Sequence, residues 1–283
     1  MKTKTFLGIF SALAILTLSS SEALAVPNLR LASLKTTDQT VVVSQNAIDN
    51  SPVFQAVPLG FAIDPQTGKQ VEGIKFIHYK KGYGHKPNHN PGNGGGDATT
   101  CYSYLASGAK WKNIEGWTMN AANTEGLDSA ALFALQEAAL EKWDAAAGAP
   151  IFESGTSTSE PLVADETSPD AVNEVYFGSI DSPGAIAVTI VWGIFGGPPF
   201  QRQLVEWDQI YDQVDFEWSA EAGGVAGKMD FDNIATHEDG HAAGMGHPSN
   251  TCIDETMYAY ADFGETKKRD LNAGDIAGID KLY

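Results

Sequence analysis

Three of the six histidines in this 283-residue chain lie within one short stretch, and no other feature restricts its fold as strongly. The stretch reads THEDGHAAGMGHPS and contains His237, Glu238, His241 and His247. On a helix, His237 and His241 are one turn apart, so their rings point in nearly the same direction. Gly244 predicts the end of that helix in a left-handed turn, which can carry His247 back toward the other two rings.

Three converging imidazoles predict a zinc site. Three neutral histidine ligands leave a tetrahedral zinc ion one open position, which holds water. A zinc ion lowers the pKa of that water from about 15.7 toward 7 and polarises a carbonyl group. Glu238 lies about 100° from His237 around the helix, beside the ion, where it can act as general base toward the water. A lone histidine is more often a core or surface imidazole, but three at this spacing around a glutamate favour the metal.

The first residues predict export of the protein. Lys2 and Lys4 precede an apolar run over residues 6–18, and small residues close the run at 23–25. This is the pattern of a secretory signal peptide over residues 1–25. A membrane anchor is the alternative, but the run is short for a membrane span and no cysteine follows it for lipid attachment. The mature protein is therefore expected to be secreted and extracellular, without a membrane partner.

The charge of the chain restricts its partners. The formal net charge is −18, whereas binding of nucleic acid requires a basic face, so no nucleic-acid partner is expected. The same charge disfavours anionic membrane surfaces and is more simply explained by solubility. An apolar fraction of 43% is normal for a globular protein with a buried core.

A change of composition divides the mature chain. Residues 26–100 contain an apolar patch at Ile74–Tyr79 and then a tract rich in Gly, Pro and Asn from Gly82 to Thr100. Such a tract is typical of a linker. We therefore place the main domain boundary there, so that residues 101–283 form the principal domain.

The principal domain is expected to be α+β or α/β. Asp128 and Asn272 can cap helices, and Asp230 or Asp232 lies near the start of another helix. Apolar residues at helical spacing and runs of β-branched residues give the expected elements. Helices are expected at 129–146, 231–243 and 273–282, and strands at 111–120, 175–177, 186–192 and within 204–218.

The pattern HExxHxxGxxH over His237–His247, with Met257 ten residues later, resembles the metzincin metalloproteases, most closely the secreted microbial matrixins. The resemblance extends from Cys101 to Tyr283. It implies three zinc-binding histidines, a general base at Glu238 and a methionine at Met257 that packs beneath the zinc ligands. The implied fold is a twisted, mostly parallel sheet with one antiparallel edge strand, above a zinc-bearing helix and a small C-terminal subdomain.

The resemblance implies a zinc-dependent endopeptidase. Its substrate would be a protein or peptide bound in extended form by backbone pairing along the antiparallel edge strand. Residues 26–100 would then be a pro-segment and linker, cleaved or inhibitory, and a monomer is expected. The alternative is a catalytically weak or inactive zinc-containing binding or scaffold protein on the same fold. Glu238 favours the peptidase, because a binding protein has no need of a general base.

Structural calcium is also implied by the family. The acidic runs Asp165–Asp170 and Asp208–Glu217 could supply carboxylate oxygens, which Ca²⁺ prefers. Acidic loops are also common as simple solvated segments, so no ligands are assigned.

Asp239 is the main departure from the family pattern, which usually has an apolar residue at this position. It lies about 200° from His237 around the helix, away from the metal. An unpaired carboxylate buried there would be costly, so we expect a nearby hydrogen-bond donor to support it.

The two cysteines, Cys101 and Cys252, allow one intramolecular disulfide in an exported protein. The alternative takes Cys101 as the zinc-capping cysteine found in the pro-segment of mammalian matrixins. The motif that surrounds that cysteine is missing here, so we expect the Cys101–Cys252 disulfide.

Overall fold

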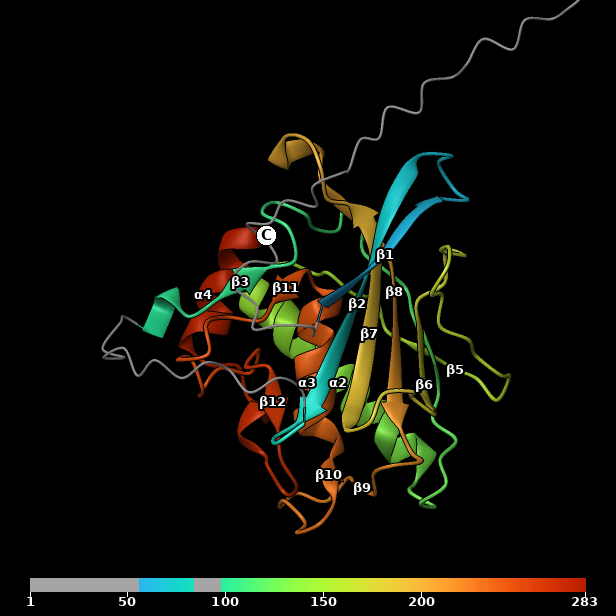
Figure 1. Cartoon of the computed structure of the whole chain (residues 1–283), viewed down its shortest axis with the longest axis vertical. Coiled ribbons are helices and arrows are strands. Elements are labelled where there is room, and N and C mark those ends of the chain that lie inside the picture. Colours follow the sequence, from blue (N-terminus) through green and yellow to red (C-terminus); the bar gives the residue numbers. More distant parts are fainter. Residues whose placement is uncertain (1–55, 84–97) are drawn as a thin grey trace, which may run out of the picture. The chain divides into compact units, whose positions relative to one another are not determined.

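A computed structural model describes residues 56–83 and 98–283, all of which belong to one compact unit over residues 42–283. The expected signal peptide and most of the expected linker lie outside the described residues. One large mixed sheet carries helices on one of its faces, and the fold is α+β, as the sequence indicated (Figure 1). None of the described helices combines the length and apolar character that a membrane span requires.

The sheet has the strand order β1-β2-β7-β8-β6-β4-β5, and β12 pairs with the end of β2. These strands are β1 (Ala56–Ile63), β2 (Gln70–Lys80), β4 (Thr118–Asn120), β5 (Thr156–Ser157), β6 (Glu174–Gly178), β7 (Ala185–Ile194), β8 (Gln203–Asp212) and β12 (Tyr260–Ala261). Two small pairs join β3 (Ser103–Tyr104) to β11 (Met245–Gly246) and β9 (Trp218–Ser219) to β10 (Met229–Asp230). The helices are α2 (Ser129–Ala147), α3 (Phe231–Ala242) and α4 (Ala273–Leu282), with short 3-10 turns at 98–100, 199–201 and 267–269.

The sheet contains an antiparallel strand beside the parallel ones, as the family resemblance implied without assigning residues to it. β4, β5, β6 and β8 are parallel, and β7 is antiparallel to β8. However, β7 is not an edge strand, because β2 pairs antiparallel with it and β1 follows beyond β2. In Figure 1 the β1–β2 hairpin, coloured blue to cyan, lies along β7. Residues 56–80, which the sequence had assigned to a separate N-terminal segment, are thus part of the main sheet.

Alternation along β2 explains why it fits there. Ile74 and Phe76 point to the helix face of the sheet and join the main core. Val71 and Ile77 point to the opposite face, where they pack with Trp192 of β7 in a second buried cluster. Successive side chains of a strand alternate between faces, so both faces of β2 contribute to burial. The Gly-, Pro- and Asn-rich tract therefore follows a strand of the sheet and does not separate two folding units.

The expected strand at 111–120 is much shorter in the structure. Only Thr118–Asn120 forms β4, and isolated bridges lie at Lys110 and Glu115. The two tryptophans of this segment, Trp111 and Trp117, are buried anchors. The indole nitrogen of Trp111 donates to Ala242 O at 2.8 Å, and that of Trp117 donates to Glu153 O at 2.9 Å.

The three helices follow their capping signals. Asp128 accepts the backbone N–H groups of Ala130 and Ala131 at the start of α2. Asp230 caps α3, which settles the choice between Asp230 and Asp232. Asn272 begins α4 in a capping box with Asp275. Each cap satisfies backbone donors that the first helical turn leaves unpaired.

The helices α2 and α3 pack against each other on the sheet. Trp143 of α2 is fully buried, and its indole nitrogen donates to Thr236 O of α3 at 2.9 Å. Lys142 forms an ion pair with Asp232 at 2.6 Å at the rim of the same contact. This contact holds α3 against the sheet.

The expected disulfide is present between Cys101 and Cys252, with a Cα–Cα distance of 5.6 Å. It joins the start of the principal domain to the loop before Met257. Cys101 is therefore not free to cap a metal ion.

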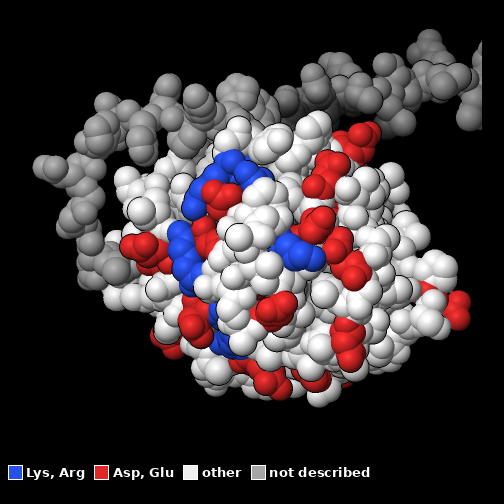
Figure 2. Space-filling view, turned by 90° about the horizontal axis from the view of Figure 1, so that it is seen from below, with Lys and Arg blue, Asp and Glu red and all other residues white. Residues whose placement is uncertain are grey.

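Acidic side chains are spread over the face shown in Figure 2, and most of the Lys and Arg side chains on that face gather toward one side. No continuous basic surface covers this face.

Candidate metal centre and active site

The structure brings the three predicted histidines together. The Nε2 atoms of His237 and His247 are 3.2 Å apart, and those of His241 and His247 are 3.1 Å apart. All three side chains are buried, and one ligand atom from each lies within 4.8 Å of the others. Three donor atoms at this spacing can hold one metal ion.

Hydrogen bonds at the other ring nitrogen orient two of the rings. Nδ1 of His237 lies 2.6 Å from Thr256 O, and Nδ1 of His241 lies 2.9 Å from Met245 O. A carbonyl oxygen can only accept, so each Nδ1 carries the proton and each Nε2 presents a lone pair. Burial also lowers the pKa of His241 to about 3, and it lowers the pKa of His237 and of His247 well below the ordinary value. Neutral imidazoles are the form that binds metal.

The spacing of the triad fits zinc. Zn–N bonds of 2.0–2.1 Å in a tetrahedron place neighbouring nitrogen atoms about 3.3 Å apart. The two separations that involve His247, 3.1 and 3.2 Å, are close to that value. The Nε2 atoms of His237 and His241 each present a lone pair to Nε2 of His247 at this distance. Nitrogen atoms placed in this way repel one another unless a cation or a proton lies between them.

The third histidine reaches the site through the turn that the sequence predicted. After α3, the chain turns at Gly244, whose φ is +101°. A side chain at Gly244 would be strained by this φ and would meet Ala109 O at 3.0 Å. The chain then pairs as β11 with β3, and this pairing leads directly to His247.

Met257, which the resemblance implied would pack beneath the zinc ligands, lies against α3, the helix that carries His237 and His241. It is fully buried, and a Cβ atom at Gly240 of α3 would collide with its sulfur and would lie 2.6 Å from Trp143. Glycine at position 240 therefore allows α3 to approach the methionine closely.

The start of α4 fixes the backbone around Met257. Asp275 accepts the backbone N–H of Met257 at 3.1 Å and that of Thr256 at 2.7 Å. Thr256 O in turn accepts from His237. Asp275 thus positions a candidate metal ligand, His237, through one intermediate residue, as outer-shell partners of metal sites commonly do.

Glu238, the predicted general base, lies beside the triad and is fully buried. Thr189 of β7 donates to Glu238 Oε2 at 2.6 Å, and Nδ1 of His78 from β2 lies 3.0 Å from Glu238 Oε1. Burial raises the pKa of Glu238 to about 8, and the Thr189 hydrogen bond and Lys268 act in the opposite direction. Both carboxylate oxygens therefore have protein partners in this conformation.

Lys268 completes this group of buried polar residues. Its Nζ atom donates to Tyr258 O and lies 3.2 Å from Nε2 of His78. With the lysine donating to Nε2, the proton of His78 is on Nδ1 and is donated to Glu238. Burial lowers the pKa of Lys268 to about 7.

Asp239 has the supporting donors that the sequence analysis required. Its Oδ1 atom accepts from Gln136 Nε2 of α2 at 2.6 Å and from Gln209 Nε2 of β8 at 3.1 Å. The hydroxyl of Tyr211 contacts the carbonyl oxygens of both glutamines at 3.0 Å. The carboxylate points away from the metal side and belongs to a polar network that joins α2, α3 and β8, although its Oδ2 atom has no hydrogen-bond partner among the described residues.

Sequence reasoning missed several residues that contact Glu238, Asp239 or their neighbours. These residues are distant in sequence and carry no local motif; they are His78, Gln136, Thr189, Gln209 and Lys268. The alternation along Ile74–Tyr79 could have placed His78 on the same strand face as Phe76. Nothing in the sequence indicated that this face would lie over Glu238.

The two acidic runs differ in the structure. In the run Asp208–Glu217, Asp208 and Asp212 accept backbone N–H groups of β6 and of nearby loops. In the other run, carboxylate oxygens of Asp165 and Asp170 lie within 4.8 Å of each other and of Glu206 in β8. Glu206 is fully buried, yet its Oε1 atom has no hydrogen-bond partner among the described residues.

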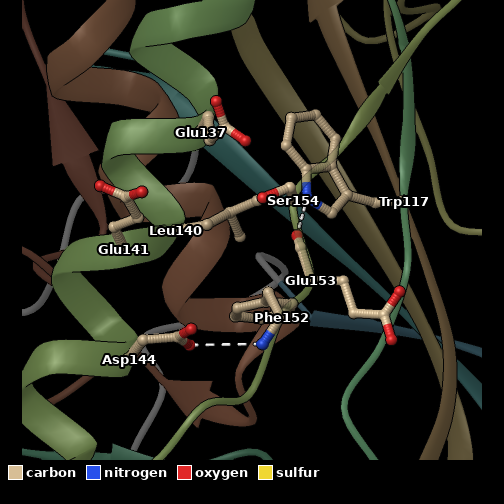
Figure 3. Close-up of a pocket in the computed structure, with 8 residues that line it drawn as sticks. All are labelled: Trp117, Glu137, Leu140, Glu141, Asp144, Phe152, Glu153 and Ser154. Carbon is tan, nitrogen blue, oxygen red and sulfur yellow. Dashed lines mark hydrogen bonds between the residues drawn. The ribbon is translucent and has the colours of Figure 1, made fainter.

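A pocket between α2 and the chain around Phe152 is lined by none of the histidine-site residues (Figure 3). Its walls include Trp117 and four carboxylate side chains, Glu137, Glu141, Asp144 and Glu153. Asp144 accepts the backbone N–H groups of Ile151 and Phe152, so this carboxylate has a structural role.

A histidine-triad metal centre with an adjacent glutamate, set beneath a mixed sheet, defines a class of zinc-dependent hydrolases. The family model described as matrixin matches residues 35–283, so the chain belongs to the matrixin family, a family of zinc metalloendopeptidases. The match begins well before Cys101 and thus includes part of the segment that we had placed outside the resemblance.

A second comparison is local. A stretch of 56 residues is 43% identical to metalloendoproteinase 1-MMP of Arabidopsis thaliana. It covers 19% of this chain and 14% of that protein, so this chain matches far less than two thirds of the relative's length.

Proposed function

We propose that the protein is a secreted zinc endopeptidase that hydrolyses peptide bonds with Glu238 as general base. The observation that carries the proposal is the convergence of three neutral imidazoles at zinc spacing, with a carboxylate on the same helix beside them. A zinc ion on His237, His241 and His247 would supply an acidified water and a Lewis acid. Secretion rests on the signal-peptide pattern of residues 1–25.

The residues of the chain have distinct roles in this proposal. Glu238 accepts the proton of the attacking water and passes it to the leaving amine. Thr189 orients the Glu238 carboxylate from β7. Met257 supports the ligands by packing against α3. Asp275 supports them by holding Thr256, whose carbonyl oxygen accepts from His237. The substrate class is a protein or peptide in extended form, which the family implies.

The first test measures metal content and hydrolysis of casein. Glu238→Ala should retain one equivalent of zinc and lose about 10²–10⁴-fold in rate, because only the general base is removed. Glu141→Ala, which removes an exposed carboxylate on α2, is the matched control and should leave the rate unchanged. Equal rates in the wild-type protein and the Glu238→Ala variant would refute this mechanism.

A zinc-containing scaffold remains the second candidate, because both oxygens of Glu238 are engaged by protein groups. Zinc bound at full occupancy without hydrolysis of casein would favour it.

We also propose that Asp165, Asp170 and Glu206 bind a calcium ion. The support is the unpartnered, buried Glu206 Oε1 that lies in reach of two other carboxylates. Calcium should raise the melting temperature of the wild-type protein and have a smaller effect on Glu206→Gln. Magnesium is the control. Equal calcium-induced shifts of the melting temperature in the wild-type protein and in Glu206→Gln would show that calcium binds elsewhere.

A further inference from the structure

The segment 248–256 joins the third histidine of the triad, His247, to Met257. Near its middle, Cys252 is only 7% exposed, whereas the residues on either side of it are exposed. The disulfide fastens Cys252 to Cys101, which stands two residues before β3. Because β3 pairs with β11, and β11 leads to His247, the bond ties this segment to the strand pair from which it starts.

Both ends of the disulfide also contact the residues that form the start of α4. The backbone N–H of Glu255 donates to Cys252 O at 3.4 Å. The Glu255 side chain is buried, and its Oε2 atom accepts the backbone N–H groups of Gly274 at 3.0 Å and Asp275 at 3.2 Å. A Cβ atom at Gly274 would collide with Cys101 O and would lie 2.9 Å from the carboxyl carbon of Glu255. The start of α4 is therefore packed between the backbone of one cysteine and a carboxylate held by the other.

The start of α4 is in turn connected to the metal centre. Asp275 accepts the backbone N–H of Thr256 at 2.7 Å, and Thr256 O lies 2.6 Å from Nδ1 of His237. Glu255 directly precedes Thr256 in the chain, so its carboxylate sets the distance between this backbone and the helix that holds it. A shift of Glu255 relative to α4 would move the acceptor that orients the His237 ring.

We propose that Glu255 is a positioning residue for His237 and that the Cys101–Cys252 disulfide fixes Glu255 against α4, so that reduction of this bond lowers the affinity for zinc. The proposal rests on the zinc centre of the proposed function and adds a redox control to it. A dithiol supplies the two electrons and two protons that convert the S–S bond into two thiols, and the dithiol itself becomes a cyclic disulfide.

The competing interpretation is that the disulfide stabilises the fold and has no influence on the metal. Two other hydrogen bonds also hold this segment: Asn272 Nδ2 donates to Asp254 O at 2.6 Å, and Thr256 Oγ1 donates to Asp270 O at 2.8 Å. If these contacts suffice, loss of the disulfide lowers the stability of the protein and leaves the zinc affinity of the folded protein unchanged.

The first experiment measures the zinc affinity of the full-length chain by competition with a chromophoric chelator. Reduction with dithiothreitol, followed by its removal in the absence of oxygen, should lower the affinity at least about tenfold, the range typical of lost outer-shell support. Reoxidation should restore it. Cys101→Ser/Cys252→Ser is the control, because it has no thiols that bind zinc themselves. It should resemble the reduced protein and not respond to dithiothreitol. Circular dichroism establishes that each form is folded, and equal affinities of the folded oxidised and reduced proteins would overturn the proposal.

The second experiment leaves the disulfide intact and changes the residue through which it acts. Glu255→Ala should lower the zinc affinity at least about tenfold, whereas Glu255→Gln should largely preserve it, because the amide oxygen can still accept from Gly274. Asp280→Ala, on the exposed side of α4, should bind zinc as the wild-type protein does. Unchanged affinity in folded Glu255→Ala would overturn the proposal.

The outcomes also separate this proposal from the proposed function. Zinc affinity that follows the state of the disulfide, without hydrolysis of casein, would support the positioning role and refute the peptidase. Hydrolysis of casein with a zinc affinity that is the same in both redox states would support the peptidase and refute the positioning role. A wild-type chain that binds no zinc would overturn both.

Discussion

At the scale of single residues, Asp239 shows how one departure from a family pattern can be compensated. The carboxylate is fully buried, but Gln136 and Gln209 donate to it from two other elements. Burial raises its pKa well above the ordinary value. An apolar residue at this position would leave Gln209 Nε2 without its acceptor and Gln136 Nε2 with Gln209 Oε1 alone, so the three residues act together.

We expect Asp239→Ala to lower the free energy of unfolding by about 1–3 kcal/mol, because it leaves buried amide donors unpaired. Urea denaturation followed by circular dichroism measures this change. Asp280→Ala, on the exposed side of α4, is the control and should stay within about 0.5 kcal/mol of the wild-type protein. If Gln136→Ala adds its full effect to that of Asp239→Ala, the two residues do not form one network.

At the scale of elements, the N-terminus of α4 supports the metal centre from below. Asp275 holds the backbone of Thr256 and Met257, and Glu255 accepts the backbone N–H groups of Gly274 and Asp275. Two carboxylates thus share one helix start. Burial, reinforced by the neighbouring Asp275, raises the pKa of Glu255 to about 7.

This raised pKa predicts a pH dependence of stability. Between about pH 4.5 and 7, the folded state holds a proton on the pair that the unfolded state has released, so stability falls as the pH rises through this window. Glu255→Gln should flatten the dependence, since it removes the titrating group. Thermal melting at several pH values between 4 and 8 measures the effect. A wild-type profile that rises with pH across the window, unchanged in the variant, would contradict the assignment.

The helices and the histidine triad were predictable because their signals are local. The capping residues Asp128 and Asn272 immediately precede the helices that they begin. His237 and His241 are four residues apart on one helix. The place of β7 was not predicted, because strand pairing is not encoded locally. The run Ala185–Ile194 is buried almost throughout, which is typical of a strand covered on both faces and flanked by others. The continuous apolar run in the sequence was therefore the feature that could have indicated an internal strand.

At the scale of the whole molecule, the disulfide joins residues that are 151 positions apart. It brings the chain that precedes β3 against the loop before Met257. Closing so long a loop restricts the unfolded chain, so on the chain-entropy model the bond contributes a few kcal/mol.

We expect Cys101→Ser/Cys252→Ser to lower the free energy of unfolding by about 2–5 kcal/mol. Thermal melting with and without reductant provides an independent measure, since the reductant should act on the wild-type protein and not on the variant. A melting temperature of the wild-type protein that does not respond to complete reduction would contradict this expectation.

The same covalent link changes the consequence of cutting the backbone between residues 83 and 98. The new amino terminus would begin just before Cys101 and would stay fastened to the body of the protein. The hairpin alone would lose its tether, and its hold would change from intramolecular to bimolecular. Its pairing with β7 would then depend on concentration, so dilution of the freshly cut protein would shift the equilibrium toward a sheet without β1 and β2.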